Sequence, residues 1–399
     1  MFQPYLDFLD RPGVTRLFAL AALTRMPISM VVLSLTLFLR STLGNFTEAG
    51  LGVGAFSVSI AAMAPLLGRM IDRYGPRRPL RIVGWLQPLM MLGVYAAAHW
   101  QAPFAVILLL VILAGASTPP LATLTRTLWR LLFITDADRR MAFSLDSVIT
   151  ELNFTLGPAV VGVLAAAVSA DVAFVTALSC NFLAVLAFQY STVLDHWRHD
   201  HADAERHWLG PLSDTRLVTY FALTFGLTFC LGLFEVGYPA YALAIGAPVY
   251  AGLLVALNGI GSAIGGALYG VWQSRRSVEQ HYALALTFLT LPFVLHALLP
   301  QLHFFIVVAF IGGLAVAPTL TSINLLVARR APALYATEAQ TWSATFIVSG
   351  FGGGMGAAGW LLETWSLTTM FWLGAAIVAS MAACAWLLQR GTHQPGTAA

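Results

Sequence analysis

The distribution of apolar residues is the feature that most restricts the fold of this chain. A helix that spans a bilayer needs about 20 predominantly apolar residues, and the sequence contains twelve apolar runs of that order or longer. Only 10% of the 399 residues are charged, which is too few for a soluble domain of this size. The runs lie near 14–40, 48–69, 80–99, 101–132, 140–168, 171–193, 216–244, 248–272, 280–299, 302–328, 334–362 and 366–390. We therefore predict an all-α membrane protein with twelve transmembrane helices.

The arginines indicate how these helices are oriented. All 21 cationic residues are Arg, and most of them lie in short turns between the apolar runs. Cytoplasmic loops of membrane proteins are enriched in Arg and Lys. If the N-terminus is cytoplasmic, every arginine except Arg25 and Arg40 falls in an inward-facing turn, in a tail or in the last turn of a span. We expect a multi-pass protein of the bacterial cytoplasmic (inner) membrane with both termini in the cytoplasm.

A long polar segment at 195–214 lies between the sixth and seventh apolar runs. The sequences on its two sides resemble each other, because Thr-Arg-Leu at 15–17 recurs at 215–217, and Gly157 and Gly162 are matched by Gly354 and Gly359. We interpret this as a duplicated six-helix unit, with a substrate site near the middle of the membrane between the halves. The predicted parts are an N-terminal bundle at 1–194, a cytoplasmic linker at 195–215 and a C-terminal bundle at 216–399.

The turn between the second and third spans reads GRMIDRYGPRR at 68–78. Positive-inside charge alone would explain its arginines but not Gly68, Asp72 or Gly75. A glycine at position 68 lets two helices approach closely, and a glycine at position 75 permits a turn that a side chain would strain. The candidate gating residues are Gly68, Asp72, Arg73, Gly75, Arg77 and Arg78.

This run, in this position among twelve spans, resembles the signature loop of the major facilitator superfamily. The resemblance implies two six-helix bundles that transport by alternating access, and a loop that latches their cytoplasmic ends together in the outward-facing state. The segment Gly157-Pro158-x-x-x-Gly162 matches part of the superfamily's antiporter signature, although Asn153 and Val161 stand where glycines are expected. In the second half Ser274 replaces Asp72, so we expect an asymmetric latch.

Arg25, Asp146 and Glu151 are ionisable residues that lie several residues inside the predicted spans of the first half. Charged side chains inside a membrane are costly and usually mark a functional site or a specific ion pair. Arg25 and Glu151 are expected at similar depths near the middle of the membrane, which allows them to pair. Asp146 lies nearer the cytoplasm, where Arg126 is its expected structural partner. Glu151 is the better proton carrier, because a carboxyl group that alternates between water and an apolar environment can change its protonation.

Other polar side chains are weaker candidates. Glu235 lies among aromatic residues of the seventh span, where it could attract a cationic amphipathic substrate, carry a proton or simply reach water at the outer interface. Single polar or aromatic residues on other spans can equally be ordinary helix contacts. The candidate coupling residues are Glu151, Glu235 and Asp146, and the candidate cavity residues are Arg25, Glu235, Asn153, Asn324, Trp342 and Gln340.

Several other classes of protein are not favoured. The three cysteines lie in apolar runs without a CxxC motif, and the histidines at 195–207 have no zinc-ligand spacing, so we expect no metal and no cofactor. The net charge is only +3 and no basic arm is present, which argues against nucleic-acid binding. Because no nucleophile and base are paired within the spans, we do not expect an enzyme.

These observations favour a secondary transporter of small molecules. Our first hypothesis is an antiporter that exports an amphipathic or drug-like compound in exchange for protons. The chain lacks the clustered polar groups that a sugar site would need. Proton-coupled uptake of a metabolite or an organic anion, with the anion held by Arg25, is the alternative, and a non-transporting membrane sensor is the alternative from another class. We expect a monomer that contacts its substrate, protons and the lipid bilayer.

Overall fold

The computed structural model describes residues 3–44, 46–197, 207–247, 249–272, 274 and 276–390. These residues form fourteen α-helices and three short 3₁₀ helices. Twelve helical spans are long and apolar enough to cross a membrane, which confirms the predicted all-α membrane fold. The helices are α1 (Gln3–Leu9), α2 (Val14–Leu43), α3 (Phe46–Tyr74), α4 (Arg77–His99), α5 (Phe104–Ala116), α6 (Leu121–Leu132), α7 (Asp136–Ala167), α8 (Ala170–Gln189), η1 (Thr192–His196), η2 (Gly210–Ser213), α9 (Thr215–Ala244), α10 (Val249–Val271), α11 (Val278–Leu298), α12 (Leu302–Arg330), η3 (Ala333–Tyr335), α13 (Ala336–Thr364) and α14 (Leu367–Arg390).

Polar residues just before several helices determine where these helices begin. Thr135 accepts a hydrogen bond from the backbone N–H of Asp138 at the start of α7. Ser277 and Gln280 form a capping box at the start of α11. These side chains satisfy backbone N–H groups that have no partner within the helix, so each helix can start where the chain returns from the predicted cytoplasmic face.

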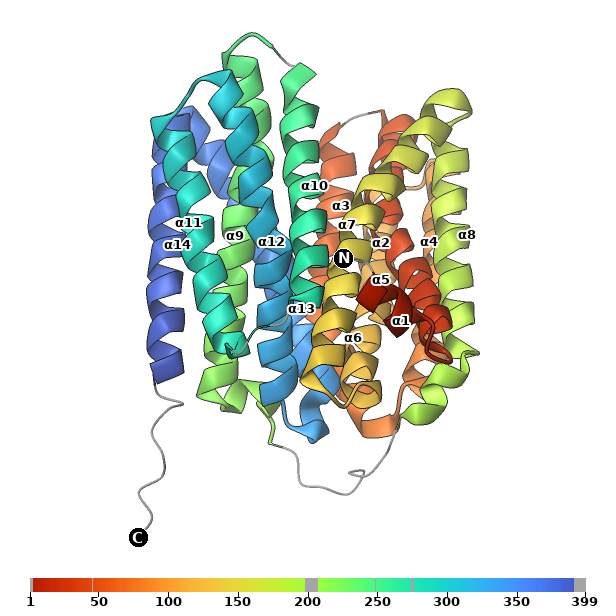
Figure 1. The fold of residues 1–399 in the computed structure, drawn as a ribbon. Coiled ribbons are helices and arrows are strands. Elements are labelled where there is room, and N and C mark those ends of the chain that lie inside the picture. The colour runs from red at the N-terminus through yellow and green to blue at the C-terminus, as the bar shows by residue number, and fades with distance from the viewer. Residues whose placement is uncertain are drawn as a thin grey trace.

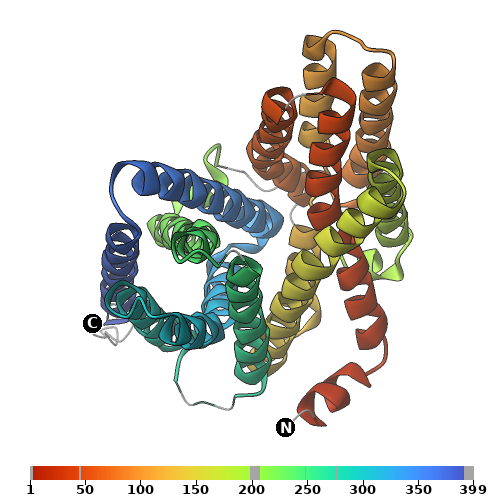
Figure 2. The ribbon, with the colours of Figure 1, turned by 90° about the horizontal axis from the view of Figure 1, so that it is seen from above.

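The helices form two bundles (Figures 1 and 2). The N-terminal half, α2–α8, packs α2 against α7 and α8, and α3 against α5. The C-terminal half, α9–α14, packs α9 against α13, α10 against α12, and α11 against α14. The boundaries given above for the bundles and the linker stay predictions. Residues 198–206, which include most of the histidine-rich linker, lie outside the described residues.

The fourth span is interrupted, which the sequence analysis did not predict. Helix α5 ends at Ala116 and α6 begins at Leu121, so residues 117–120 break the span near its middle. Pro119 and Pro120 explain the break, because proline lacks a backbone N–H and clashes with the preceding helical turn. Ser117 is buried, and its hydroxyl donates to the carbonyl of Leu113. Such a break within a membrane requires protein surroundings of this kind.

One apolar cluster connects the two bundles at their predicted cytoplasmic ends. It contains Phe8, Phe18 and Trp129 from the first half of the chain, and it continues to Phe221 and Tyr282 in the second half. Removing this apolar surface from water stabilises the contact between the halves. The predicted cytoplasmic side is therefore closed in this conformation.

Candidate functional site

The predicted gating aspartate joins the two halves. Asp72 lies near the end of α3, and its carboxylate accepts hydrogen bonds of 2.9–3.0 Å from the backbone N–H of Thr337 and of 2.8 Å from that of Glu338. These N–H groups belong to the first turn of α13, where no carbonyl within the helix can accept them. The negative charge also matches the positive end of the helix dipole. Asp72 therefore caps a helix of the opposite half.

An ion pair between a partly exposed arginine and a buried glutamate lies beside this cap. Arg69 on α3 contacts Glu338 on α13, with 2.6 Å between Arg69 Nη2 and Glu338 Oε1. Arg69 Nε lies 3.1 Å from both carboxylate oxygens, and Nη2 also donates to the carbonyl of Trp208. Glu338 is only 1% exposed, whereas the Arg69 side chain is 37% exposed. Glu338 is not among the residues predicted from the sequence, because an acid in the first turn of a span is also explained by the helix dipole.

The other residues of the loop have different surroundings. Gly75 has a φ of 77°, which is the left-handed conformation that its glycine was expected to allow. Arg77 lies 2.5 Å from Asp195, and both side chains are exposed. Arg73 lies over the ring of Tyr74 at the surface, and Arg78 is also exposed. A Cβ at Gly68 would clash with Thr341 of α13, so the expected close approach is present.

A second junction between the halves is related to the first by the internal repeat. Here α10 packs against α7, and a Cβ at Gly270 would clash with Ser144. This clash corresponds to the one between a Cβ at Gly68 and Thr341 at the first junction. Arg140 Nη1 donates to the carbonyl of Trp272 at 2.8 Å, and Arg329 pairs with Asp136 at 2.9 Å. Ser274, which replaces Asp72 in the repeat, accepts a hydrogen bond from the backbone N–H of its near neighbour Arg276.

The same helix faces separate toward the opposite end of the bundles, which is the predicted outer side of the membrane. Gly50 and Gly359 lie about five turns from Gly68 and Thr341 respectively, which places them on the same faces about 27 Å away. A Cβ at Gly50 or Gly359 would meet nothing within 4 Å. The α3 and α13 helices therefore touch at their inner ends and diverge outward.

The related junction diverges in the same way. Gly252 and Gly162 lie about five turns from Gly270 and Ser144 on α10 and α7. A Cβ at either glycine would also meet nothing within 4 Å. Both pairs of helices are closed at the predicted cytoplasmic end and open at the opposite end, so with the predicted topology the structure is outward-facing.

Glu151 connects the halves at the base of this opening. Glu151 lies about two helical turns after Ser144 on α7, further from the closed end. Its Oε1 accepts a hydrogen bond of 2.7 Å from the Ser262 hydroxyl on α10. Ser262 is buried and Glu151 is half-buried. Glu235 on α9 is exposed and lies within electrostatic range of Glu151. Two acids from opposite halves therefore act on the same region.

Arg25 and Asp146 form a buried network within the N-terminal half. Arg25 is 4% exposed, and its Nη2 pairs with Asp146 Oδ1. Arg126 Nε lies 3.1 Å from the other oxygen of Asp146, which confirms the expected structural partner. Trp129 Nε1 donates to Asp146 at 3.2 Å, and Arg25 Nε donates to Thr150 at 3.2 Å.

This network corrects one sequence-based interpretation. Similar depth allowed Arg25 to pair with Glu151, but Arg25 contacts Asp146 instead. The physical reason is the helical period, because Asp146 and Thr150 share one face of α7, whereas Glu151 points about 100° away from Thr150. The proposed roles of Arg25 in substrate binding and of Asp146 in coupling stay predictions, and both side chains are buried in this conformation.

The weaker cavity candidates are mostly buried. Asn153 donates to the carbonyl of Ile149 at 2.9 Å, and its own carbonyl accepts a hydrogen bond from Ser29. Asn324 and Gln340 are at most 3% exposed. Trp342 is half-buried and packs near Phe346 at 6.2 Å between ring centroids. Their role in a substrate cavity stays a prediction, and it requires a conformation in which these side chains are exposed to the cavity.

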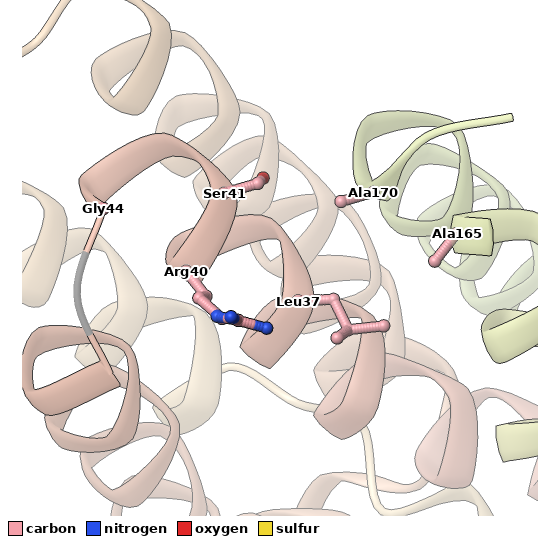
Figure 3. A pocket seen from close by; sticks show the side chains of 6 residues that line it. All are labelled: Leu37, Arg40, Ser41, Gly44, Ala165 and Ala170. Atoms are coloured by element: carbon pink, nitrogen blue, oxygen red, sulfur yellow. The ribbon is translucent and has the colours of Figure 1, made fainter.

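A pocket of about 430 Å³ lies at the predicted outer end of the N-terminal half (Figure 3). Its walls come from the end of α2, the end of α7 and the start of α8. The lining residues are Leu37, Arg40, Ser41, Gly44, Ala165 and Ala170. Because all of them belong to one half, this pocket is separate from the opening between the halves.

The chain matches known proteins in fold and family. The sequence model of the Major Facilitator Superfamily matches residues 17–278. A search of curated protein sequences finds no match. The structure resembles that of a bacterial homologue of the iron transporter ferroportin in the outward-facing state, with a TM-score of 0.77, 14% identity, and 94% of this chain and 99% of that chain covered.

Two other solved structures show the same fold. The human organic anion transporter MFSD10 (TETRAN) has a TM-score of 0.68 and 17% identity, with 94% of this chain and 99% of that chain covered. The E. coli fucose:proton symporter FucP has a TM-score of 0.71 and 12% identity, with 92% and 98% covered. Sequence identities this low establish a shared fold but do not indicate a shared substrate. The match of the family model to residues 17–278, which is more than half of the chain, shows that this protein belongs to the Major Facilitator Superfamily of membrane transporters.

Proposed function

We propose that this chain is a proton-coupled antiporter that exports an amphipathic, cationic compound across the bacterial cytoplasmic membrane. The observation that carries the proposal is the position of Glu151. It lies at the base of the outward opening and accepts a hydrogen bond from Ser262 of the other half. A group that bridges the halves and can bind a proton is suited to link protonation to the conformational change.

The contact between Glu151 and Ser262 suggests how the coupling would operate. In the outward-facing state a proton from outside would reach Glu151 through the opening. When the halves rock to open inward, α7 and α10 would move apart at this level and the Ser262 bond would break. The proton would then leave to the cytoplasm, and the difference in proton binding between the two states would supply the driving force.

The charges support a cationic substrate. Glu235 is exposed, has no ion-pair partner among the described residues, and acts on the same region as Glu151. Two carboxylates facing one region attract a cation and repel an anion. The anion alternative depends on Arg25, but that guanidinium is paired with Asp146 inside the N-terminal half. We therefore do not favour uptake of an organic anion.

The topology completes the proposal. The junctions that hold the structure closed carry many of the chain's arginines, including Arg69, Arg140 and Arg329. Because Arg collects on the cytoplasmic side of membrane proteins, we place this end and both termini in the cytoplasm. One chain contains both halves and both junctions, so we propose that the monomer transports.

Purified protein in proteoliposomes tests the proposal. An acidic lumen should drive accumulation of a fluorescent amphipathic cation such as ethidium through molecules whose outer face is toward the lumen. Glu151→Gln should abolish this gradient-driven accumulation. Glu363→Gln is the matched control, because Glu363 is an exposed acid at the end of α13. Unchanged accumulation by Glu151→Gln would contradict the assignment.

A further inference from the structure

We propose that α1 is a clasp that holds the cytoplasmic ends of the two halves together in the outward-facing state, through the hydroxyl of Tyr5. This inference goes beyond the proposed transport function, because it depends on neither the substrate nor the coupling ion. It concerns a short helix that precedes the first span and belongs to neither bundle's set of six.

Helix α1 is attached to the N-terminal half. Phe8 is 1% exposed, and its ring centroid lies 6.0 Å from that of Phe18 and 5.0 Å from that of Phe133. Arg11, just after the helix, pairs with Asp138 at the start of α7 at 2.8 Å. These apolar and ionic contacts mean that α1 moves with the N-terminal half as a rigid attachment.

Tyr5 reaches from α1 to the opposite half. Its hydroxyl donates a 2.6 Å hydrogen bond to the carbonyl of Ala267 on α10, and it lies 3.2 Å from Ser144 Oγ on α7. Ser144 in turn donates to the carbonyl of Gly266 on α10. Tyr5 is 6% exposed, and burial raises the pKa of its hydroxyl above the ordinary value of 10.0, so the proton needed for donation is retained. Figures 1 and 2 show α1 beside α7 and α10.

The internal repeat explains why a clasp is needed at this junction. At the first junction Asp72 of α3 caps α13 across the halves. At the second junction the equivalent residue is Ser274, and within the described part of the chain its hydroxyl accepts a local hydrogen bond from Arg276 and makes none across the halves. A Cβ at Gly270 would clash with the Tyr5 hydroxyl, so Tyr5 occupies the space beside the glycine that corresponds to Gly68. Tyr5 thus supplies a cross-half bond where the repeat has lost its aspartate.

A simpler role for α1 does not account for these contacts. An amphipathic helix that only anchors the chain at the membrane surface would direct its aromatic residues toward lipid. Here Phe8 and Tyr5 are buried in protein, and the Tyr5 hydroxyl bonds to a backbone carbonyl of the other half. Opening toward the cytoplasm separates α10 from α7 and must break this bond. The clasp therefore favours the outward-facing state.

Distances between spin labels on purified protein test the clasp without any substrate. Labels at Arg81 on α4 and Arg276 before α11, both exposed on the cytoplasmic side, report separation of the halves. Tyr5→Phe removes only the hydroxyl and should raise the ratio of inward-facing to outward-facing protein about fivefold, as the loss of one buried hydrogen bond implies. Phe8→Ala, which detaches α1 from its half, should raise the ratio at least as much.

Tyr190→Phe is the matched control, because its side chain is an exposed tyrosine at the end of α8. It should leave the distance distribution unchanged. An unchanged distribution in both Tyr5→Phe and Phe8→Ala would overturn the clasp. Since the readout requires neither substrate nor proton gradient, a failure here is separate from a failure of the proposed antiport.

Discussion

Asp72 of the N-terminal half caps the helix that begins at Thr337 and Glu338 of the C-terminal half, with oxygen–nitrogen distances of 2.8–3.0 Å. The contact explains why an aspartate stands in a loop whose other charges are arginines. A carboxylate at a helix N-terminus satisfies free N–H groups and interacts with the helix dipole. The cap exists only while the predicted cytoplasmic ends touch, so we expect its energy to stabilise the outward-facing state alone.

Removing this cap should favour the inward-facing state. Loss of an N-cap costs about 1 kcal/mol, so Asp72→Ala should raise the ratio of inward-facing to outward-facing protein by about fivefold. Asp72→Asn should have a smaller effect, because the amide oxygen still accepts a hydrogen bond. Accessibility of a cytoplasmic cysteine to a membrane-impermeant reagent measures the ratio. Asp171→Ala, on the opposite side of the membrane, is the control, and equal accessibility in all variants would refute the latch.

The close approach at Gly68 makes a different prediction. Gly68→Ala places a methyl group against Thr341 and the backbone of Glu338, so the inner ends of α3 and α13 must separate. Gly50→Ala adds the same methyl group to the same face of α3, about five turns away, in open space. Spin-label distances should show opening of the cytoplasmic side for Gly68→Ala and no change for Gly50→Ala. The same response in both variants would mean that α3 and α13 do not diverge outward.

The geometry of the Arg69 guanidinium should contribute more to the closed junction than its positive charge does. Arg69 Nε and Nη2 both contact the carboxylate of Glu338, and Nη2 also reaches the carbonyl of Trp208. Lysine keeps the charge but cannot make these contacts together. Arg69→Lys should therefore increase tryptic cleavage at cytoplasmic sites near the junction, while Arg81→Lys at the exposed start of α4 should not. Wild-type protection in Arg69→Lys would show that charge alone suffices.

The buried network around Asp146 should stabilise the N-terminal half. Asp146→Asn leaves Arg25 and Arg126 without their shared countercharge, and breaking a buried ion pair costs about 3–5 kcal/mol. The melting temperature in detergent should fall clearly, and less than additively when Arg25→Gln is combined with it. Asp195→Asn, which breaks the exposed pair with Arg77, should cost under about 1 kcal/mol. Equal melting temperatures for Asp146→Asn and Asp195→Asn would contradict the structural role of Asp146.

Much of the architecture follows from local sequence. The twelve spans could be predicted because membrane helices need long apolar runs. The sequence matches Gly157 to Gly354 and Gly162 to Gly359, and the structure places Gly162 and Gly359 on corresponding open faces. Gly75 adopts the positive φ that its turn suggested. These features depend on the residues near each position, which is why the sequence reports them.

The contacts between distant segments could not be predicted. Depth in the membrane allowed Arg25 to pair with Glu151 and placed Asp146 nearer the cytoplasm with Arg126, whereas the rotation of α7 about its axis brings Asp146 to Arg25. Glu338 and Tyr5 are ordinary residues of a helix start and a short terminal helix until α3 and α10 are placed beside them. The break in the fourth span was not predicted from Pro119 and Pro120, because proline also occurs inside intact spans such as α2.

The most direct test of the account measures proton movement itself. A pH-sensitive dye in the lumen of proteoliposomes, without an imposed gradient, should report protons that leave the lumen when ethidium is transported in. We expect substrate-dependent alkalinisation of the lumen by the wild-type protein and by Glu363→Gln, and none by Glu151→Gln. Substrate-dependent proton movement of wild-type size in Glu151→Gln would contradict the central claim that Glu151 carries the coupled proton.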